Sequence, residues 1–110
     1  MEIKTKDNIC IIRLLSPKID KRESFRLFEE LKSYAAYNVG IDLSFVNDCT
    51  IEFIECLKEV SNISLFNIPS NIFVLFNCMN VDKICNLFVS ENDFMTSSHR
   101  LLNRKFAVVK

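Results

Sequence analysis

Residues 9–20 read ICIIRLLSPKID and predict a buried strand followed by the start of a helix. The segment 9–15 is short, rich in β-branched residues and bounded by turn residues, as is typical of a strand. Pro17 cannot donate a hydrogen bond to a sheet and is expected to end the strand. Asp20 followed by Glu23 is a capping-box pattern, which predicts that a helix begins at the aspartate.

The flanking segments extend this strand–helix unit in both directions. A short apolar segment starts at Ile3, and the polar turn 6–8 separates it from residues 9–15, so the two segments predict a hairpin. Beyond Asp20, apolar residues recur at helical spacing and predict a helix that ends before Asn38. Its apolar face is expected to contain Phe25, Phe28, Leu31 and Ala35, with Leu27 and Tyr34 beside it.

The rest of the chain alternates strands and helices. Residues 39–43 predict a third strand, and a second helix capped by Asp48 or Thr50 follows it. Residues 72–76 are apolar at every position, as expected for a central strand covered on both faces. The second helix is expected to face inward with Ile51, Ile54, Leu57 and Val60. The later expected elements are a short helix over 81–88, a strand over 94–96 and a helix capped by Ser97 or Ser98, whereas residues 106–109 fit either a strand or a tail.

This order, β-β-α-β-α-β-α-β-α, predicts an α/β fold. Strands that alternate with helices need crossover connections, which produce a mostly parallel sheet with helices packed against it. The opening hairpin adds an antiparallel edge, so we expect a mixed sheet of four to five strands with about four helices. The 110 residues are enough for a single domain over 1–110.

Composition excludes several classes of function. The net charge of zero argues against a dedicated nucleic-acid binder. The longest apolar runs are five residues, against the roughly 20 that a membrane-spanning helix needs, so no direct membrane insertion is expected. The first residues lack the pattern of a signal peptide, which predicts a cytoplasmic protein. With Gly40 the only glycine and His99 the only histidine, neither a phosphate-binding loop nor a multi-histidine metal site is encoded, and no cofactor is expected.

The five cysteines include no C-x-x-C pair, which excludes a zinc ribbon and a thioredoxin-type redox pair. We interpret them as small buried hydrophobic residues. Cys49 differs from the others because it falls at an expected strand-to-helix junction, where a helix N-terminus favours the thiolate. A small thiol enzyme that uses Cys49 is therefore one alternative for the function.

Two stretches of sequence resemble the STAS domain, the family of anti-sigma-factor antagonists, stressosome scaffolds and cytoplasmic tails of sulfate transporters. Residues 14–20, LLSPKID, resemble the family's leucine–x–glycine–x–leucine–aspartate segment before the first helix, with Pro17 where glycine is usual. Residues 41–46, IDLSFV, resemble its third strand, which reads aspartate–leucine–serine and then valine. The element order, the length and the opening hairpin fit as well, so the resemblance implies a STAS-like fold.

The chain departs from the family at the start of the second helix. There the family has an aspartate, a phosphorylatable serine or threonine, a serine and a glycine. Ungapped placement from Asp42 puts the aspartate on Thr50 and the acceptor on Ile51, whereas skipping two residues puts them on Asp48 and Cys49. Neither register has a serine or threonine at the acceptor position. The usual switch is therefore expected to be lost or displaced by one residue, with Thr50 as either a phosphosite or a plain helix cap.

The resemblance implies a non-enzymatic protein-interaction module, an anti-sigma-factor-antagonist-like regulator in bacterial signalling. Its partner would be an anti-sigma kinase-like protein or another STAS or stressosome-type protein, and the chain itself a monomer or weak homodimer. A variant of this role is a small STAS subunit of an ABC lipid transporter. The candidate partner-binding residues are Asp48, Cys49, Thr50, Ile51, Glu52 and Glu55.

The acidic residues of this region allow two interpretations. Asp48, Glu52, Glu55 and Glu59 form either a solvated helix face or part of a docking surface. Because Glu52 already supplies a negative charge near the phosphorylation point, one hypothesis is that the domain is fixed in a constant charge state.

Overall fold

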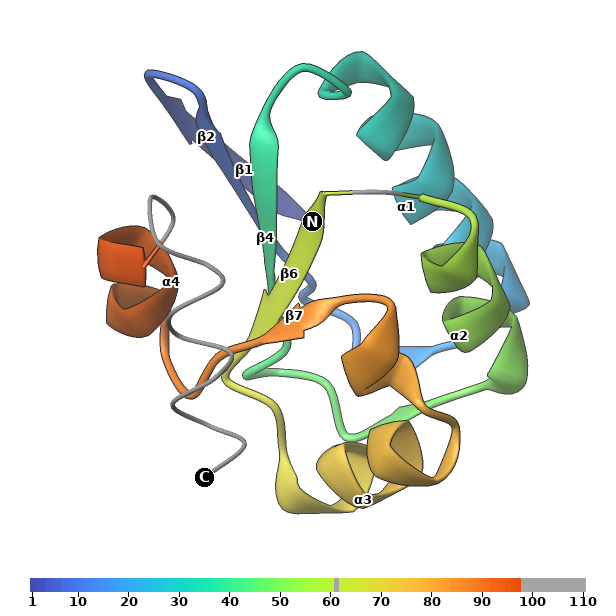
Figure 1. The fold of residues 1–110 in the computed structure, drawn as a ribbon. Coiled ribbons are helices and arrows are strands. Elements are labelled where there is room, and N and C mark those ends of the chain that lie inside the picture. The colour runs from blue at the N-terminus through green and yellow to red at the C-terminus, as the bar shows by residue number, and fades with distance from the viewer. Residues whose placement is uncertain (61, 98–110) are drawn as a thin grey trace.

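The computed structural model describes residues 1–60 and 62–97 (Figure 1). The main sheet contains β1 (Glu2–Lys6), β2 (Ile9–Arg13), β4 (Asn38–Asp42), β6 (Ile63–Phe66) and β7 (Asn86–Leu87). A second small sheet pairs β3 (Lys18–Ile19) with β5 (Asp48–Cys49). The helices are α1 (Lys21–Ser33), α2 (Ile51–Lys58), α3 (Ser70–Cys78) and α4 (Glu91–Ser97), with a 3-10 helix, η1 (Val81–Lys83).

The main sheet has the strand order β1-β2-β4-β6-β7. β1 and β2 form the expected antiparallel hairpin, and every other neighbouring pair is parallel. Because each parallel strand is added beside the preceding one in the same direction, right-handed crossovers place the connecting helices on one face. Figure 1 shows α1 and α2 on that face and α4 on the opposite one. The predicted α/β class, mixed sheet, opening hairpin and four helices are confirmed.

The two faces of the sheet have separate hydrophobic clusters. The larger cluster joins alternate strand residues such as Ile12 and Ile41 to α1, α2, α3 and η1. The smaller cluster contains Ile11, Phe66, Phe88 and Phe94, with α4 as its only helix among the described residues. The alternation of strand side chains between the two faces accounts for this division, since Ile11 and Ile12 are neighbours on β2.

Gly40 allows α4 to approach the sheet. A Cβ atom at this position would lie 2.6 Å from Cε2 of Phe94 and 2.9 Å from Cε2 of Phe66. The rings of Phe66 and Phe94 stack with their centroids 5.6 Å apart, directly over the glycine. The glycine is therefore needed for space, which is one of the recognised reasons for glycine inside a strand.

The predicted start of α1 is confirmed. Asp20 is the N-cap, and its Oδ1 accepts a hydrogen bond from the Glu23 N–H at 3.0 Å. The helix buries Ser24, Leu27 and Leu31. Phe25 was expected to face inward, but it is 56% exposed because the buried side of the helix runs through positions 24, 27 and 31. Ala35 lies beyond the helix end and is also exposed.

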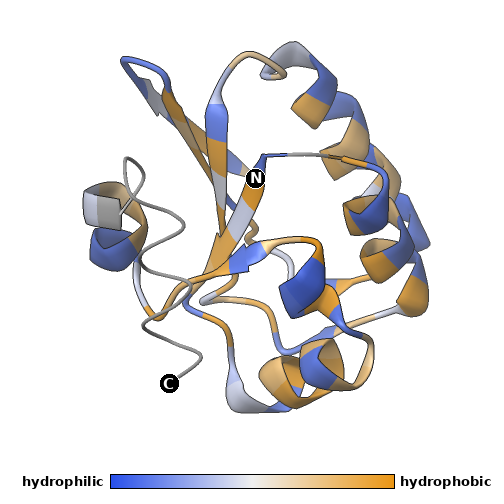
Figure 2. Ribbon diagram, in the orientation of Figure 1, coloured by the Kyte–Doolittle hydropathy of each residue, from blue (hydrophilic) through white to orange (hydrophobic). Residues whose placement is uncertain are grey.

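The prediction of a central strand over 72–76 is wrong. These residues form most of α3, in which Ile72 and Phe76 are buried one turn apart and Phe73 and Val74 are exposed. The buried interior strand after β4 is β6, which was not predicted; it lies between β4 and β7 and is buried at all four positions. A short apolar run fits a buried strand and a buried helix equally well by periodicity, and here the helix begins directly after Pro69. Figure 2 shows that α3 is largely hydrophobic.

The later elements also differ from expectation. Of residues 81–88, only Val81–Lys83 are helical, and the short strand β7 follows. Residues 94–96 belong to α4 rather than to a strand. Phe94 packs from this helix against the sheet, in the smaller cluster. Ser97 lies within α4, and the remaining predictions, from Ser98 through 106–109, lie outside the described residues.

Asparagine takes the usual place of glycine in several turns. Among the described residues, the left-handed backbone region is occupied by Asp7, Asn62, Asn67 and Asn80 and by no glycine. Asparagine and aspartate tolerate this conformation better than other side chains. Asn62 and Asn67 directly flank β6, so these two turns set where this interior strand begins and ends.

Candidate functional site

The small sheet brings the starts of α1 and α2 together. The N–H groups of Asn47 and Asp48 both donate to the carbonyl of Pro17, and the Thr50 N–H donates to the carbonyl of Ile19. The Asn71 side chain then donates to the Asn47 carbonyl at 2.7 Å, which ties the first turn of α3 to the same place. We call residues 43–55, from the end of β4 into α2, the corner loop region. Two-residue strands leave no periodic pattern, so this pairing could not be predicted from the sequence.

The candidate partner-binding residues divide into exposed and buried ones. Asp48, Ile51 and Glu55 are exposed, and Ile51 keeps 53% of its surface in solvent. Thr50 and Glu52 are half-buried, and Cys49 is buried. Ile51 was expected to face the core, but α2 buries Phe53, Ile54 and Leu57 instead, which turns its first residue outward.

Thr50 is the N-cap of α2, as one of the two predicted caps, but its side chain caps no backbone N–H of the helix. Its hydroxyl lies 3.4 Å from the Ile19 carbonyl, to which it donates. A hydrogen bond from this hydroxyl is the main cause that lowers the pKa of Glu52, and the Glu52 backbone N–H and Lys21 add to it. Glu52 therefore holds a stable negative charge at the helix N-terminus, where the helix dipole favours one.

Cys49 has the surroundings of a core residue. It is 7% exposed, and burial, followed by the charge of Asp48, raises its thiol pKa to about 11. A catalytic cysteine needs an accessible thiolate near neutral pH, which requires a lowered pKa. The geometry around Cys49 thus lacks what a thiol nucleophile requires. Cys10 and Cys85 are buried too, as interpreted from sequence, whereas Cys56 is half-buried and Cys78 is exposed.

Two exposed hydrophobic side chains beside the predicted residues were missed. Phe45 in the corner loop region is 53% exposed, and Leu15, in the segment after β2, is 50% exposed. The Phe45 ring lies 6.0 Å from the Arg13 guanidinium, a cation–π distance that holds the ring at the surface. Leu15 was expected in the buried strand over 9–15, and Phe45 falls in the stretch that resembles the family's third strand, so only the structure marks both as exposed.

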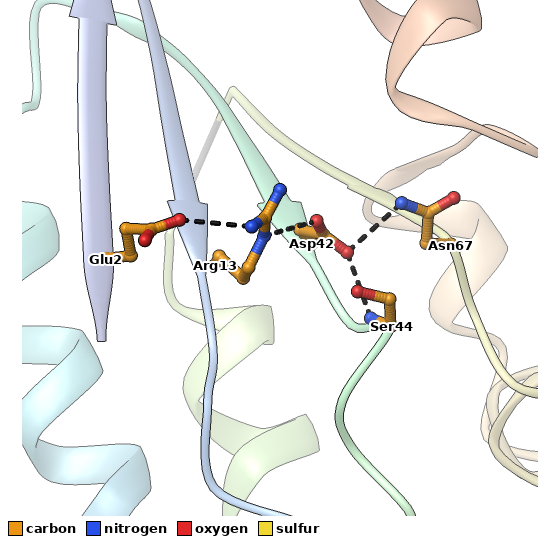
Figure 3. Close-up of polar contacts among 5 residues, drawn as sticks. All are labelled: Glu2, Arg13, Asp42, Ser44 and Asn67. Carbon is orange, nitrogen blue, oxygen red and sulfur yellow. Dashed lines mark hydrogen bonds and ion pairs between the residues drawn. The ribbon is translucent and has the colours of Figure 1, made fainter.

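The Arg13 that contacts Phe45 belongs to a polar network around the buried Asp42, drawn in Figure 3. Arg13 ends β2, Asp42 ends β4 and Asn67 follows β6, so the network joins the C-terminal ends of three parallel strands. The Asp42 carboxylate accepts from Arg13 Nε at 3.0 Å, from the Ser44 N–H at 2.9 Å and from Asn67 Nδ2 at 3.2 Å. Arg13 also pairs with Glu2 at 3.1 Å.

The network keeps Asp42 ionised although its side chain is only 2% exposed. Burial alone raises the pKa of Asp42, but the hydrogen bonds from Ser44, Asn67 and Arg13 outweigh burial and lower it. Every oxygen of this carboxylate is therefore occupied by a donor, which makes it a clamp across the strands rather than a free acid or base. Asp42 served to align the family motif, but its place in a buried polar network was not predicted from the sequence.

The remaining acidic residue of the predicted stripe, Glu59, lies at the other end of α2 as its C-cap. The stripe therefore spans the helix instead of gathering at the corner loop region. Within residues 1–60 and 62–97, no cluster of three or more metal-ligating side chains is present. Over the same residues, no helix has the length and apolar character needed to cross a membrane.

No family model matches the chain, and no curated protein is significantly similar to it in sequence.

Proposed function

We propose that this protein is a non-enzymatic, STAS-like interaction module that acts in the cytoplasm and binds a protein partner through the corner loop region and the first turn of α2. The observation that carries the proposal is that one short segment exposes two large hydrophobic side chains, Phe45 and Ile51, and also contains the carboxylates of Asp48, Glu52 and Glu55. Exposed aromatic and aliphatic side chains surrounded by charges are the usual composition of a docking surface.

The order of elements supports the family part of the proposal. An antiparallel hairpin edge followed by parallel strands, with α2 starting beside α1, is the arrangement that the resemblance of residues 14–20 and 41–46 implies. The partner proposed on this basis is an anti-sigma kinase-like protein or another STAS or stressosome-type protein. The same surface would serve a STAS subunit of an ABC lipid transporter, which differs only in the partner.

The charge of the corner loop region is proposed to be constant. Thr50 donates its hydroxyl proton to the Ile19 carbonyl and helps to lower the pKa of Glu52, so a phosphate on this oxygen would break the contact with Ile19 and repel the Glu52 carboxylate. Glu52 supplies a negative charge in the place where a phosphate would act. Incubation with an anti-sigma kinase and ATP, followed by tandem mass spectrometry, is expected to find no phosphate on Thr50; phosphothreonine there would contradict the constant charge.

Binding can be tested with two surface variants and a matched control. Ile51→Ser removes an exposed apolar contact and Glu52→Lys reverses a charge, and both are expected to weaken binding by about tenfold or more, in the range of interface hot spots. Glu30→Lys reverses an exposed charge on α1, away from the corner loop region, and is expected to bind like the wild type. Isothermal titration calorimetry would measure binding to the purified anti-sigma kinase of the same genome, and circular dichroism would check that each variant folds.

The outcomes separate the two roles. Binding to the kinase that is lost in both variants supports the signalling role, and binding to a transport ATPase that is lost in both supports the transporter role. If both variants bind as tightly as Glu30→Lys, the corner loop region is not the docking surface and the proposal fails.

A further inference from the structure

A second site lies at the opposite edge of the sheet, where the parallel strands begin. A cavity of about 310 Å³ opens between the C-terminal ends of α1 and α2 and the first residues of β4 and β6. This volume is at the lower end of the range for small-molecule sites, about 300–1,000 Å³. Its walls contain Phe28, Tyr34, Tyr37, Val60 and Ile63, with Glu59 among the charged residues.

The aromatic walls are held in place by the backbone. Tyr34 is the C-cap of α1, and its N–H donates to the Leu31 carbonyl. The Tyr37 N–H in turn donates to the Tyr34 carbonyl, so a tight turn places both rings on one side. The two rings meet edge to face with their centroids 5.5 Å apart. Both are half-buried, which leaves part of each ring surface available inside the cavity.

One of the lining rings already carries a cation. The Lys32 ammonium lies 5.7 Å from the centroid of the Phe28 ring, within cation–π distance. The same ammonium pairs with Glu29 at 2.9 Å, which balances its charge. Lys32 therefore uses the Phe28 ring as its own cation–π partner, and Tyr34 and Tyr37 are the lining rings left for a bound cation.

Two further features make the cavity favourable for positive charge. Glu59 is exposed at the cavity and forms no ion pair with any residue of 1–60 or 62–97. Both α1 and α2 end at the cavity, and the C-terminal end of a helix carries partial negative charge. Val39, Val60 and Ile63 complete the walls with aliphatic surface.

We propose that this cavity binds a small organic cation whose charged group is itself covered by apolar atoms, such as a quaternary ammonium. Aromatic faces attract the charge, the aliphatic walls contact the methyl groups, and Glu59 balances the charge at the opening. A strongly hydrated ammonium is expected to bind more weakly, because it would lose its bound water and has no methyl groups to contact the aliphatic walls of the cavity. This site is separate from the corner loop region and does not depend on the function proposed there.

Three probes of nearly equal shape test the proposal. Choline has a trimethylammonium head, 3,3-dimethylbutan-1-ol is its neutral counterpart, and 3,3-dimethylbutanoate carries a negative charge on the same hydrocarbon. Titration into ¹⁵N-labelled protein is expected to show choline binding about tenfold or more tightly than either counterpart. The shifted amides should include Tyr34, Tyr37 and Val60. Equal binding of the neutral probe, tighter binding of the anion through Lys32, or no shift with choline up to tens of millimolar would overturn the proposal.

Two variants and a control locate the effect. Glu59→Gln keeps the shape of an exposed side chain, and it is expected to weaken choline several-fold while leaving the neutral probe unchanged. Tyr37→Leu removes one ring and is expected to weaken choline more than the neutral probe. Glu30→Gln, an exposed change of the same kind on α1 outside the cavity, should bind choline as the wild type does. If Glu59→Gln and Glu30→Gln affect choline equally, the charge contribution assigned to Glu59 is refuted.

Discussion

The two faces of the main sheet are covered in different ways. On one face, α1, α2, α3 and η1 share a large cluster in which each strand residue meets several helices. On the other face, four buried residues form the cluster, and contact with α4 depends on Phe94 lying over Gly40. The comparison teaches that the first face holds the fold together through many overlapping contacts, whereas the second depends on a single close approach.

The largest expected effect is on the first face. Ile54 is 1% exposed inside the large cluster, so Ile54→Asp would bury an unpaired carboxylate at a cost of several kcal/mol. Because a domain of this size is stable by only about 5–15 kcal/mol, we expect the variant to be largely unfolded. Circular dichroism and urea denaturation would show this, with Glu55→Asp at the neighbouring exposed position as the control. A cooperative transition close to that of the wild type would contradict the description of this face.

A smaller and more local effect is expected on the second face. Gly40→Val places methyl groups where the Phe94 and Phe66 rings lie, and such overpacking costs about 1–3 kcal/mol. We expect the melting temperature to fall while the larger cluster stays formed. Hydrogen exchange would then accelerate first in the amides of α4 and only slightly in α2. Uniform acceleration in both helices would show that the two faces fold as one unit.

Elements with a local sequence signal could be predicted, whereas elements set by long-range packing could not. Asp20 and the periodic residues of α1 were recognised because a cap and an amphipathic pattern are local signals. Residues 72–76 were misassigned because five consecutive apolar residues also fit a strand. The strand β6 was missed because it has only four residues, of which Ser64 is polar, and an asparagine stands at each end. Which of the two short segments enters the sheet is decided by packing against β4, which no local pattern shows.

The candidate site follows the same rule. Asp48, Ile51, Glu52 and Glu55 could be placed near a helix start from sequence, because caps and acidic first turns are local. Phe45 and Leu15 could not be identified, because their importance lies in their exposure. The burial of Cys49 was equally hidden, since it follows from the pairing of β5 with β3.

The polar clamp at the C-terminal ends of β2, β4 and β6 predicts that the stability of the fold depends on pH. Asp42→Asn would turn an amide N–H₂ toward the Arg13 donor or the Ser44 and Asn67 donors, and one unmet hydrogen bond costs about 1–3 kcal/mol. The pKa of Asp42 is lower in the folded state than in the unfolded chain. The ionised carboxylate therefore contributes fully to the free energy of unfolding above the ordinary aspartate pKa of about 3.9, and this contribution disappears as the pH falls through the pKa of the folded state.

Urea denaturation at a series of pH values would check this. The difference in unfolding free energy between the wild type and Asp42→Asn should be constant at neutral pH and should shrink below about pH 4. Asp7→Asn, in the exposed hairpin turn, is the control with no such trend. A difference that stays constant down to pH 2 would mean that the carboxylate charge contributes nothing to the clamp.

The smallest expected effect has the opposite sign. Ser64 is 1% exposed on β6, and its hydroxyl has no hydrogen-bond partner among residues 1–60 and 62–97. Ser64 pairs in register with Gly40, so it lies on the same face as the contact with Phe94. Removing an unpaired buried hydroxyl by Ser64→Ala should therefore raise the unfolding free energy, by on the order of 1 kcal/mol. A loss of stability in urea denaturation would instead contradict an unpaired hydroxyl, and the second face would then depend on more than the single approach of α4 to Gly40.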